Sequence, residues 1–216
     1  PLWSRGLGDV YKRQTHAWPT LDWDTLSERY GMQRDAFEKF VPASEYANFA
    51  AWAHATQSYQ GELLKHHIES LRRLKYSPNG GFCFLMLADA QPCIGYGIYD
   101  HARRPKLAAE VVRAACRDVI ITASTPASHT VGHEFTCDVH VVSDLSQSIR
   151  NATATATLEW NGGSRTWAWQ GDIDPDTCAK VGSIAIVLSV PGTATLSLKL
   201  EADGLGETNR YSFSVG

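Results

Sequence analysis

The hydrophobic pattern of this 216-residue chain changes its period near Asp118. Before that position, apolar residues recur at helical spacing. After it, short segments rich in Thr, Val and Ser alternate between apolar and polar residues. A helical period predicts helices and a period of two predicts half-buried strands, because side chains at those spacings share one face. The chain is therefore expected to join a helical front part to an all-β part.

The front part contains three helical signals and one apolar segment. Short helices are expected before Gly31, with Thr20 or Asp22 as cap, and before Pro42, and a long amphipathic helix is expected over residues 44–75. The segment "FCFLMLA" (82–88) is continuously apolar, which predicts a strand buried on both faces. Pro105 suits a first helical position, so a last helix is expected to follow it.

The all-β part contains seven short candidate strands, with turn residues between them. Several alternate cleanly, and in one of them the apolar residues are Ala194, Leu196, Leu198 and Leu200. Seven such strands in about a hundred residues are typical of an immunoglobulin-like sandwich. The candidate strands are "VIITAS", "EFTCDVHVVS", "ATATATLEW", "SRTWAWQG", "KVGSIAIVLS", "TATLSLKLE" and "RYSFSV".

The front part is too small to be a complete domain. One strand between two helices leaves strand edges and an apolar helix stripe uncovered, so residues 15–117 are expected to end a larger domain. Residues 4–14, "SRGLGDVYKRQ", resemble a translated sequencing adapter. Residues 1–14 are therefore treated as a disordered terminus outside the fold, and the natural reading frame is expected to continue upstream of Thr15.

Charge and cysteine usage exclude several classes of protein. A net charge of −3 without long like-charge runs argues against nucleic-acid and anionic-membrane partners, and no apolar stretch reaches membrane-spanning length. An odd number of dispersed thiols favours a reduced, cytoplasmic protein, although one disulfide between Cys137 and Cys178 is conceivable. The five cysteines lack ligand spacing: Cys83, Cys93, Cys116, Cys137 and Cys178.

Two clusters of functional residue types have simpler interpretations. His66 and His67 lie near Glu62 and Glu69, but adjacent histidines point about 100° apart on a helix, so no metal site is expected. Sugar stacking is one interpretation of three sandwich tryptophans, and core filling is the commoner use of such residues. The tryptophans are Trp160, Trp167 and Trp169.

The polar segment after the apolar strand is the candidate site. Asp89 follows that strand directly, where β/α barrels place side chains that face substrate, and Gln91 and Tyr96 lie further along. Asp89 either contacts substrate or braces its own loop. Asp100 is expected to brace the approach to the next helix.

With these residues in view, the chain resembles the C-terminal part of glycoside hydrolase family 2, closest to its β-mannosidase-like branch. "ATQSYQGELLKHHIESLRRLKY" is similar to the penultimate barrel helix, and "GGFCFLMLADAQPCIGYGIYDHARRPK" to the eighth strand and its loop. Leu85 and Gln91 stand where the branch usually has tryptophan, and Ala88 where it has asparagine. The matching positions are Phe84, Leu87, Asp89, Pro92, Asp100, Arg104, Pro105 and Lys106.

The resemblance implies an α+β fragment. Residues 15–117 would form the C-terminal piece of a (β/α)8 TIM barrel, and residues 118–216 an all-β immunoglobulin-like sandwich. It further implies a retaining glycosidase that acts on terminal β-linked sugars without a cofactor, using two carboxylates from the fourth and seventh strands. Both are expected upstream of Thr15. This chain would supply no catalytic residue, and Asp89, Gln91 and Tyr96 would contact the carbohydrate substrate.

A second hypothesis belongs to another class of protein. The sandwich could be a non-catalytic carbohydrate-binding module, with the helical part as an accessory. Such a module requires an open aromatic surface on the sandwich and a front part that folds by itself. A structural sandwich that only supports a barrel is the third hypothesis, and it is compatible with the first.

Overall fold

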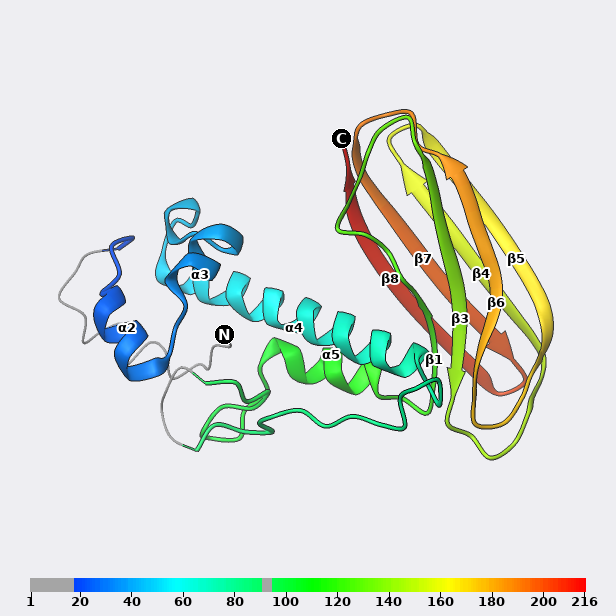
Figure 1. Cartoon of the computed structure of the whole chain (residues 1–216), viewed down its shortest axis with the longest axis horizontal. Coiled ribbons are helices and arrows are strands. Elements are labelled where there is room, and N and C mark those ends of the chain that lie inside the picture. The colour runs from blue at the N-terminus through cyan, green and yellow to red at the C-terminus, as the bar shows by residue number, and fades with distance from the viewer. Residues whose placement is uncertain (1–17, 91–94) are drawn as a thin grey trace. The chain divides into compact units, whose positions relative to one another are not determined.

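The computed structural model describes residues 18–90 and 95–216, in two compact units (Figure 1). The front unit comprises Pro1–Ile68 and Phe82–Ala115, and the sandwich unit comprises Glu69–Gly81 and Cys116–Gly216. The sandwich unit thus includes a stretch of chain well before residue 118. The adapter-like residues 4–14 lie outside the described residues.

The front unit contains the helices that the sequence predicts. Asp22 caps α2 (Trp23–Tyr30) by accepting a hydrogen bond from the Thr25 amide (3.1 Å). Gly31 ends this helix in the left-handed conformation, with φ of 66°, which suits glycine. The other helices are α3 (Arg34–Phe40), the 3-10 helix η1 (Ala43–Glu45), α4 (Phe49–Arg73) and α5 (Leu107–Ala115).

Two small hydrophobic clusters hold the front unit together. The first surrounds Trp52, whose indole nitrogen donates a hydrogen bond to the Val41 carbonyl (2.8 Å). The second lies between α4 and α5, where Ile68 packs with Ala108 and Val112. Gly61 of α4 allows this approach, because a side chain there would meet Val111 of α5 at 3.2 Å.

The predicted buried strand over residues 82–88 is wrong for this chain. The segment has an irregular conformation, and only Ala88 forms an isolated bridge, with Tyr99. Leu85 and Leu87 are 81% and 64% exposed. The physical reason is that a buried strand needs neighbours on both edges, and the described residues of the front unit contain no strand to pair with it.

The sandwich unit contains the seven predicted strands and one further short strand. Two sheets form, with strand orders β1-β3-β6 and β2-β8-β7-β4-β5. All neighbours are antiparallel except β2 and β8. The strands are β1 (Val119–Ala123), β2 (Ser128–His129), β3 (Glu134–Ser143), β4 (Ile149–Trp160), β5 (Gly163–Ile173), β6 (Thr177–Val187), β7 (Gly192–Ala202) and β8 (Leu205–Val215).

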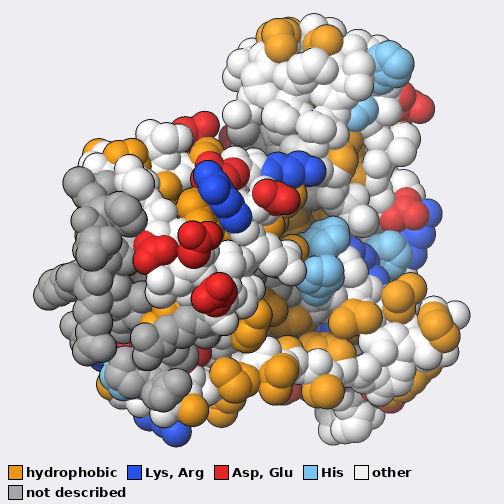
Figure 2. Space-filling model, turned by 60° about the vertical axis from the view of Figure 1, so that its left-hand side comes forward, with side chains coloured by type: hydrophobic (Ala, Val, Ile, Leu, Met, Phe, Trp, Pro, Cys, Tyr) orange, Lys and Arg blue, Asp and Glu red, His pale blue; other side chains and the backbone are white. Residues whose placement is uncertain are grey.

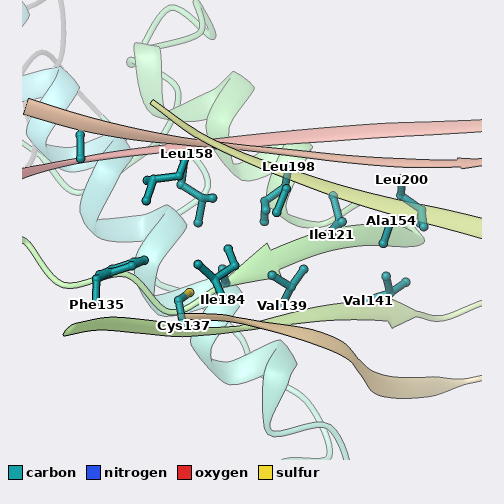
Figure 3. Packing of buried hydrophobic residues seen from close by; sticks show 14 of the residues in the cluster. Ile121, Phe135, Cys137, Val139, Val141, Ala154, Leu158, Ile184, Leu198 and Leu200 are labelled. Atoms are coloured by element: carbon teal, nitrogen blue, oxygen red, sulfur yellow. The ribbon is translucent and has the colours of Figure 1, made fainter. Parts of the chain in front are cut away.

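The core of this unit lies between the two sheets, whose apolar side chains point toward one another (Figure 3). Alternation along β7 is as predicted, since the four apolar residues from Ala194 to Leu200 are buried. Cys137 and Cys178 are both free thiols, so the conceivable disulfide is not formed. The register explains this: Cys137 stands opposite Ile184, and Cys178 opposite Val142 at the other end of the strand pair.

The last turn of α4 belongs to the sandwich unit through a buried polar network. The Glu69 carboxylate accepts hydrogen bonds from Tyr211 Oη (2.6 Å), Asn209 Nδ2 (2.8 Å) and Thr122 Oγ1 (3.1 Å). Arg72 Nη2 lies 2.7 Å from the Asp144 carboxylate. Buried polar groups are stable only when they are paired, so the bonds of Glu69 fix the helix end to β1 and β8, and the Arg72 pair adds a contact to the residue after β3.

Candidate functional site

The candidate site is the loop that joins the apolar segment to α5, and a buried ion pair lies at its base. Lys106 Nζ lies 3.0 Å from Asp89 Oδ2, and neither side chain is exposed to solvent. The other carboxylate oxygen accepts a hydrogen bond from the Gly97 amide (3.1 Å), and Lys106 Nζ also donates to the Gly95 carbonyl (3.2 Å). The pair therefore fixes the backbone on both sides of Tyr96.

Backbone hydrogen bonds close the same loop. The Leu87 carbonyl accepts from the amides of Ile98 (3.1 Å) and Tyr99 (3.0 Å), and the Asp89 amide donates to the Tyr99 carbonyl (3.1 Å). Gly97 is required for this closure, because a side chain there would lie 2.6 Å from the Asp89 amide nitrogen. The two arms of the loop thus approach too closely for any other residue.

A second buried carboxylate, Asp100, organises the turn before α5. Its oxygens accept hydrogen bonds from the amides of Ala102 and Arg104 (both 2.9 Å) and from Arg104 Nε (2.8 Å). Burial by itself would raise the pKa of Asp100, but these hydrogen bonds and the Arg104 charge outweigh it and lower the pKa. The expectation that Asp100 braces this turn is confirmed.

The three candidate substrate-binding residues have different environments. Asp89 is completely buried beneath the loop, which favours the bracing interpretation over direct contact with a sugar. Tyr96 is 47% exposed, at the part of the loop that the ion pair holds. Gln91 lies outside the described residues. The sequence did not predict the ion pair between Asp89 and Lys106. The opposite charges at the two ends of one loop were the signal that could have indicated it.

Exposed hydrophobic residues accompany the site. Figure 2 shows a row of exposed hydrophobic side chains along the lower edge of the view. The large apolar residues exposed in the segment before the loop are Phe82 (37%), Leu85 (81%) and Leu87 (64%). An apolar stretch of this kind is typical of a surface that another part of a protein covers.

The remaining clusters of functional residue types have structural environments. His66 and His67 are exposed, with ring centroids 5.7 Å apart, and Glu69 is committed to the sandwich network. The described residues contain no group of three side chains arranged to hold a metal ion. The sandwich tryptophans are half-buried and pack against the core, as the commoner interpretation predicted. Within the described part of the chain, no helix is both long and apolar enough to cross a bilayer.

Solved structures identify the fold. An exo-chitosanase from Amycolatopsis orientalis, in complex with PNP-β-D-glucosamine, is 20% identical and matches 83% of this chain and 21% of its own, with a TM-score of 0.69. A second structure of that enzyme matches 96% of this chain at 18% identity, with a TM-score of 0.70. A β-D-mannosidase from Dictyoglomus thermophilum is 17% identical over 84% of this chain, with a TM-score of 0.68. This chain has the fold of part of a glycosidase.

The similarity confirms, at the level of the fold, the resemblance to glycoside hydrolase family 2. The chain spans about a quarter of the length of these enzymes, 21%, 26% and 22% of the three structures. Its sequence matches no family model and no curated protein.

Proposed function

We propose that this chain is the C-terminal part of a retaining, β-mannosidase-like glycoside hydrolase that removes terminal β-linked sugars. In this proposal, residues 15–117 form the last β/α unit of a (β/α)8 barrel, and residues 118–216 form an immunoglobulin-like sandwich after it. The observation that carries the proposal is the fold similarity to an exo-chitosanase and a β-mannosidase, which covers 83% and 84% of the chain.

The exposed apolar segment supports the barrel interpretation. Residues 82–88 have the composition of a buried parallel strand, yet Leu85 and Leu87 are exposed. In a complete barrel, neighbouring strands would pair with the backbone of this segment and helices would cover its outer face. An upstream part of the same protein would therefore supply the missing neighbours.

The charged residues of the loop support the assignment of catalysis to the upstream part of the protein rather than to this chain. Retaining hydrolysis needs two carboxyl groups about 5 Å apart, one as nucleophile and one as acid and base. Asp89 and Asp100 are each buried in an ion pair, with Lys106 and Arg104, so neither is available for this chemistry. The proposal assigns catalysis to upstream carboxylates, substrate contact to Tyr96 and Gln91, and loop positioning to Asp89.

Recovery of the upstream reading frame from the source DNA tests this proposal. The complete protein would be assayed against aryl β-mannoside, β-glucosaminide, β-glucoside, β-galactoside and β-glucuronide, beside the 216-residue chain alone. We expect turnover by the complete protein and none by the chain. An upstream frame without barrel strands, or turnover by the chain that is lost when one of its own carboxylates is changed, would overturn the proposal.

One observation favours a structural role for the sandwich within the same enzyme. The Glu69 network and the ion pair between Arg72 and Asp144 attach the end of α4 to the sandwich strands. We propose that the sandwich supports the last barrel helices in this way. Amide exchange on the whole chain tests the point: residues 69–81 should exchange together with β1 and β8 rather than with residues 49–68.

A further inference from the structure

The sandwich unit contains a cleft at the place where β5 and β6 face each other. Both strands stand at the edge of their sheets, β5 beside β4 and β6 beside β3. The cleft has a volume of about 210 Å3. Its lining residues are Ala152, Ala154, Trp169, Gln170, Gly171, Asp172, Ile173, Ala179, Lys180, Val181 and Leu200.

Small residues at core-facing positions create the space. Among the residues that line the cleft, Ala152, Ala154, Gly171 and Ala179 are small, and only Ile173, Val181 and Leu200 are larger aliphatic residues. The Trp169 indole occupies part of the gap and lies directly over Gly182, where an added Cβ would be 2.0 Å from the ring. The small residues make room for the Trp169 ring, and the cleft is the space that this ring leaves unfilled.

The rim of the cleft is polar. Because β5 and β6 are edge strands, each has backbone amide and carbonyl groups on its free side that no strand satisfies. Asp172 and Lys180 flank these edges, and ion pairs with Arg150 (2.6 Å) and Asp138 (2.8 Å) hold them. The Trp169 ring thus lies beside backbone donors and acceptors that no neighbouring strand pairs with.

We propose that this cleft binds a single pyranose ring. A pyranose has an apolar C–H face that can pack on the Trp169 indole, and its hydroxyl groups can pair with the free backbone groups of β5 and β6. A purely apolar ligand would leave those groups without partners. A peptide would pair along a whole strand edge instead of entering a cleft of this size. The site lies in the sandwich unit and is separate from the substrate contacts assigned above to Tyr96 and Gln91.

Titration of the whole chain with monosaccharides tests the proposal. The probes are the methyl β-glycosides of glucose, mannose and glucosamine, followed by NMR of the indole and backbone amides. We expect the Trp169 indole signal and the amides of 170–172 and 179–181 to shift, with dissociation constants on the order of millimolar, as suits one small contact surface.

Gly171→Val is the variant that fills part of the cleft, because Gly171 lines it. The new side chain fits without a clash, since no atom lies within 4 Å of a Cβ added at this position. Gly206→Val is the matched control, since Gly206 of β8 is another strand glycine with nothing within 4 Å. We expect the first variant to lose the shifts and the second to retain them, both with unchanged melting temperature. If Gly171→Val unfolds, Trp169→Phe replaces it and should weaken the shifts.

Three results would overturn the proposal. The first is that no sugar shifts these signals, and the second is that the shifts persist when Gly171→Val or Trp169→Phe is folded. The third is that cyclohexanol, an apolar ring with one hydroxyl, produces the same shifts as the sugars, which would make the cleft a general apolar hollow. Sugar shifts confined to Tyr96 and its neighbours would likewise place binding at the loop and leave the cleft empty.

Discussion

The Lys106 ammonium group lies 3.0 Å from the Asp89 carboxylate, and both side chains are fully buried. Removing one partner from such a pair leaves an isolated charge inside the protein. We therefore expect Lys106→Met to destabilise the folded loop by about 3–5 kcal/mol. The double variant Asp89→Asn with Lys106→Met should recover part of this loss, since no buried charge remains.

Chemical denaturation, together with amide exchange at Gly97, measures this effect. Arg113→Ala provides the control, because Arg113 and Glu110 form an exposed pair on α5 and such pairs contribute little. Equal effects of Lys106→Met and Arg113→Ala would mean that the buried pair does not hold the loop.

The contact between Tyr211 and Glu69 makes the stability of the sandwich unit depend on pH. Burial raises the pKa of Tyr211, and the Glu69 charge and its hydrogen bond raise it further. The folded state thus holds the phenol proton more tightly than the unfolded chain, whose tyrosines titrate at about pH 10. This stabilisation is fully present below that pH and is lost as the pH rises above it.

Denaturation of wild type and Tyr211→Phe across the alkaline range tests this linkage. At neutral pH the variant should be less stable by about 1–3 kcal/mol, because Glu69 loses the hydrogen bond that Tyr211 Oη donates at 2.6 Å. The two proteins should converge as the pH rises above about 10. Parallel curves at every pH would show that the Tyr211 proton does not contribute.

Local sequence patterns predicted most of the helices and strands, because caps, helix ends and buried strand faces are determined by residues close in sequence. Gly31 and Asp22 bound α2 as expected, and the alternation from Ala194 to Leu200 identified the buried face of β7. The polar joint at Glu69 could not be predicted, because its partner Tyr211 is 142 residues away and either residue alone is compatible with an exposed surface.

The error at residues 82–88 has a different origin. Composition gives the environment in which a segment would be stable, and it does not give the neighbours that provide this environment. Phe82 and Leu85 have the composition of a buried strand and are exposed here. For the same reason the sequence suggested Asp89 as a site residue but could not decide between contact and bracing.

Gly182 is expected to resist any substitution, because the Trp169 ring lies against its backbone. In Gly182→Ala the new Cβ would lie 2.0–2.5 Å from three ring carbons, so the indole must move. Overpacking of this kind lowers the free energy of unfolding by about 1–3 kcal/mol. Gly171→Ala is the matched control, with no atom within 4 Å, and thermal unfolding compares the two. Similar melting temperatures would show that Trp169 does not pack tightly on β6.

Thiol reactivity should follow burial. Cys83 is exposed, whereas burial raises the pKa of the Cys137 thiol to about 11. Since the thiolate is the reactive form, iodoacetamide at neutral pH should label Cys83 well before Cys137. Mass spectrometry of peptides from a time course measures the order. Early labelling of Cys137 in the folded chain would show that β3 opens readily.

The exposed apolar segment should make the chain associate with itself. Leu85 and Leu87 contribute to a solvent-exposed apolar surface, and such surfaces favour association between molecules. The double variant Leu85→Asp with Leu87→Asp should reduce association, measured by light scattering across a concentration series, with little change in melting temperature. Thr166→Asp, at an exposed position of β5, controls for added charge alone and should leave association nearly unchanged. A large loss of melting temperature in the double variant would instead show that this segment is packed within the chain.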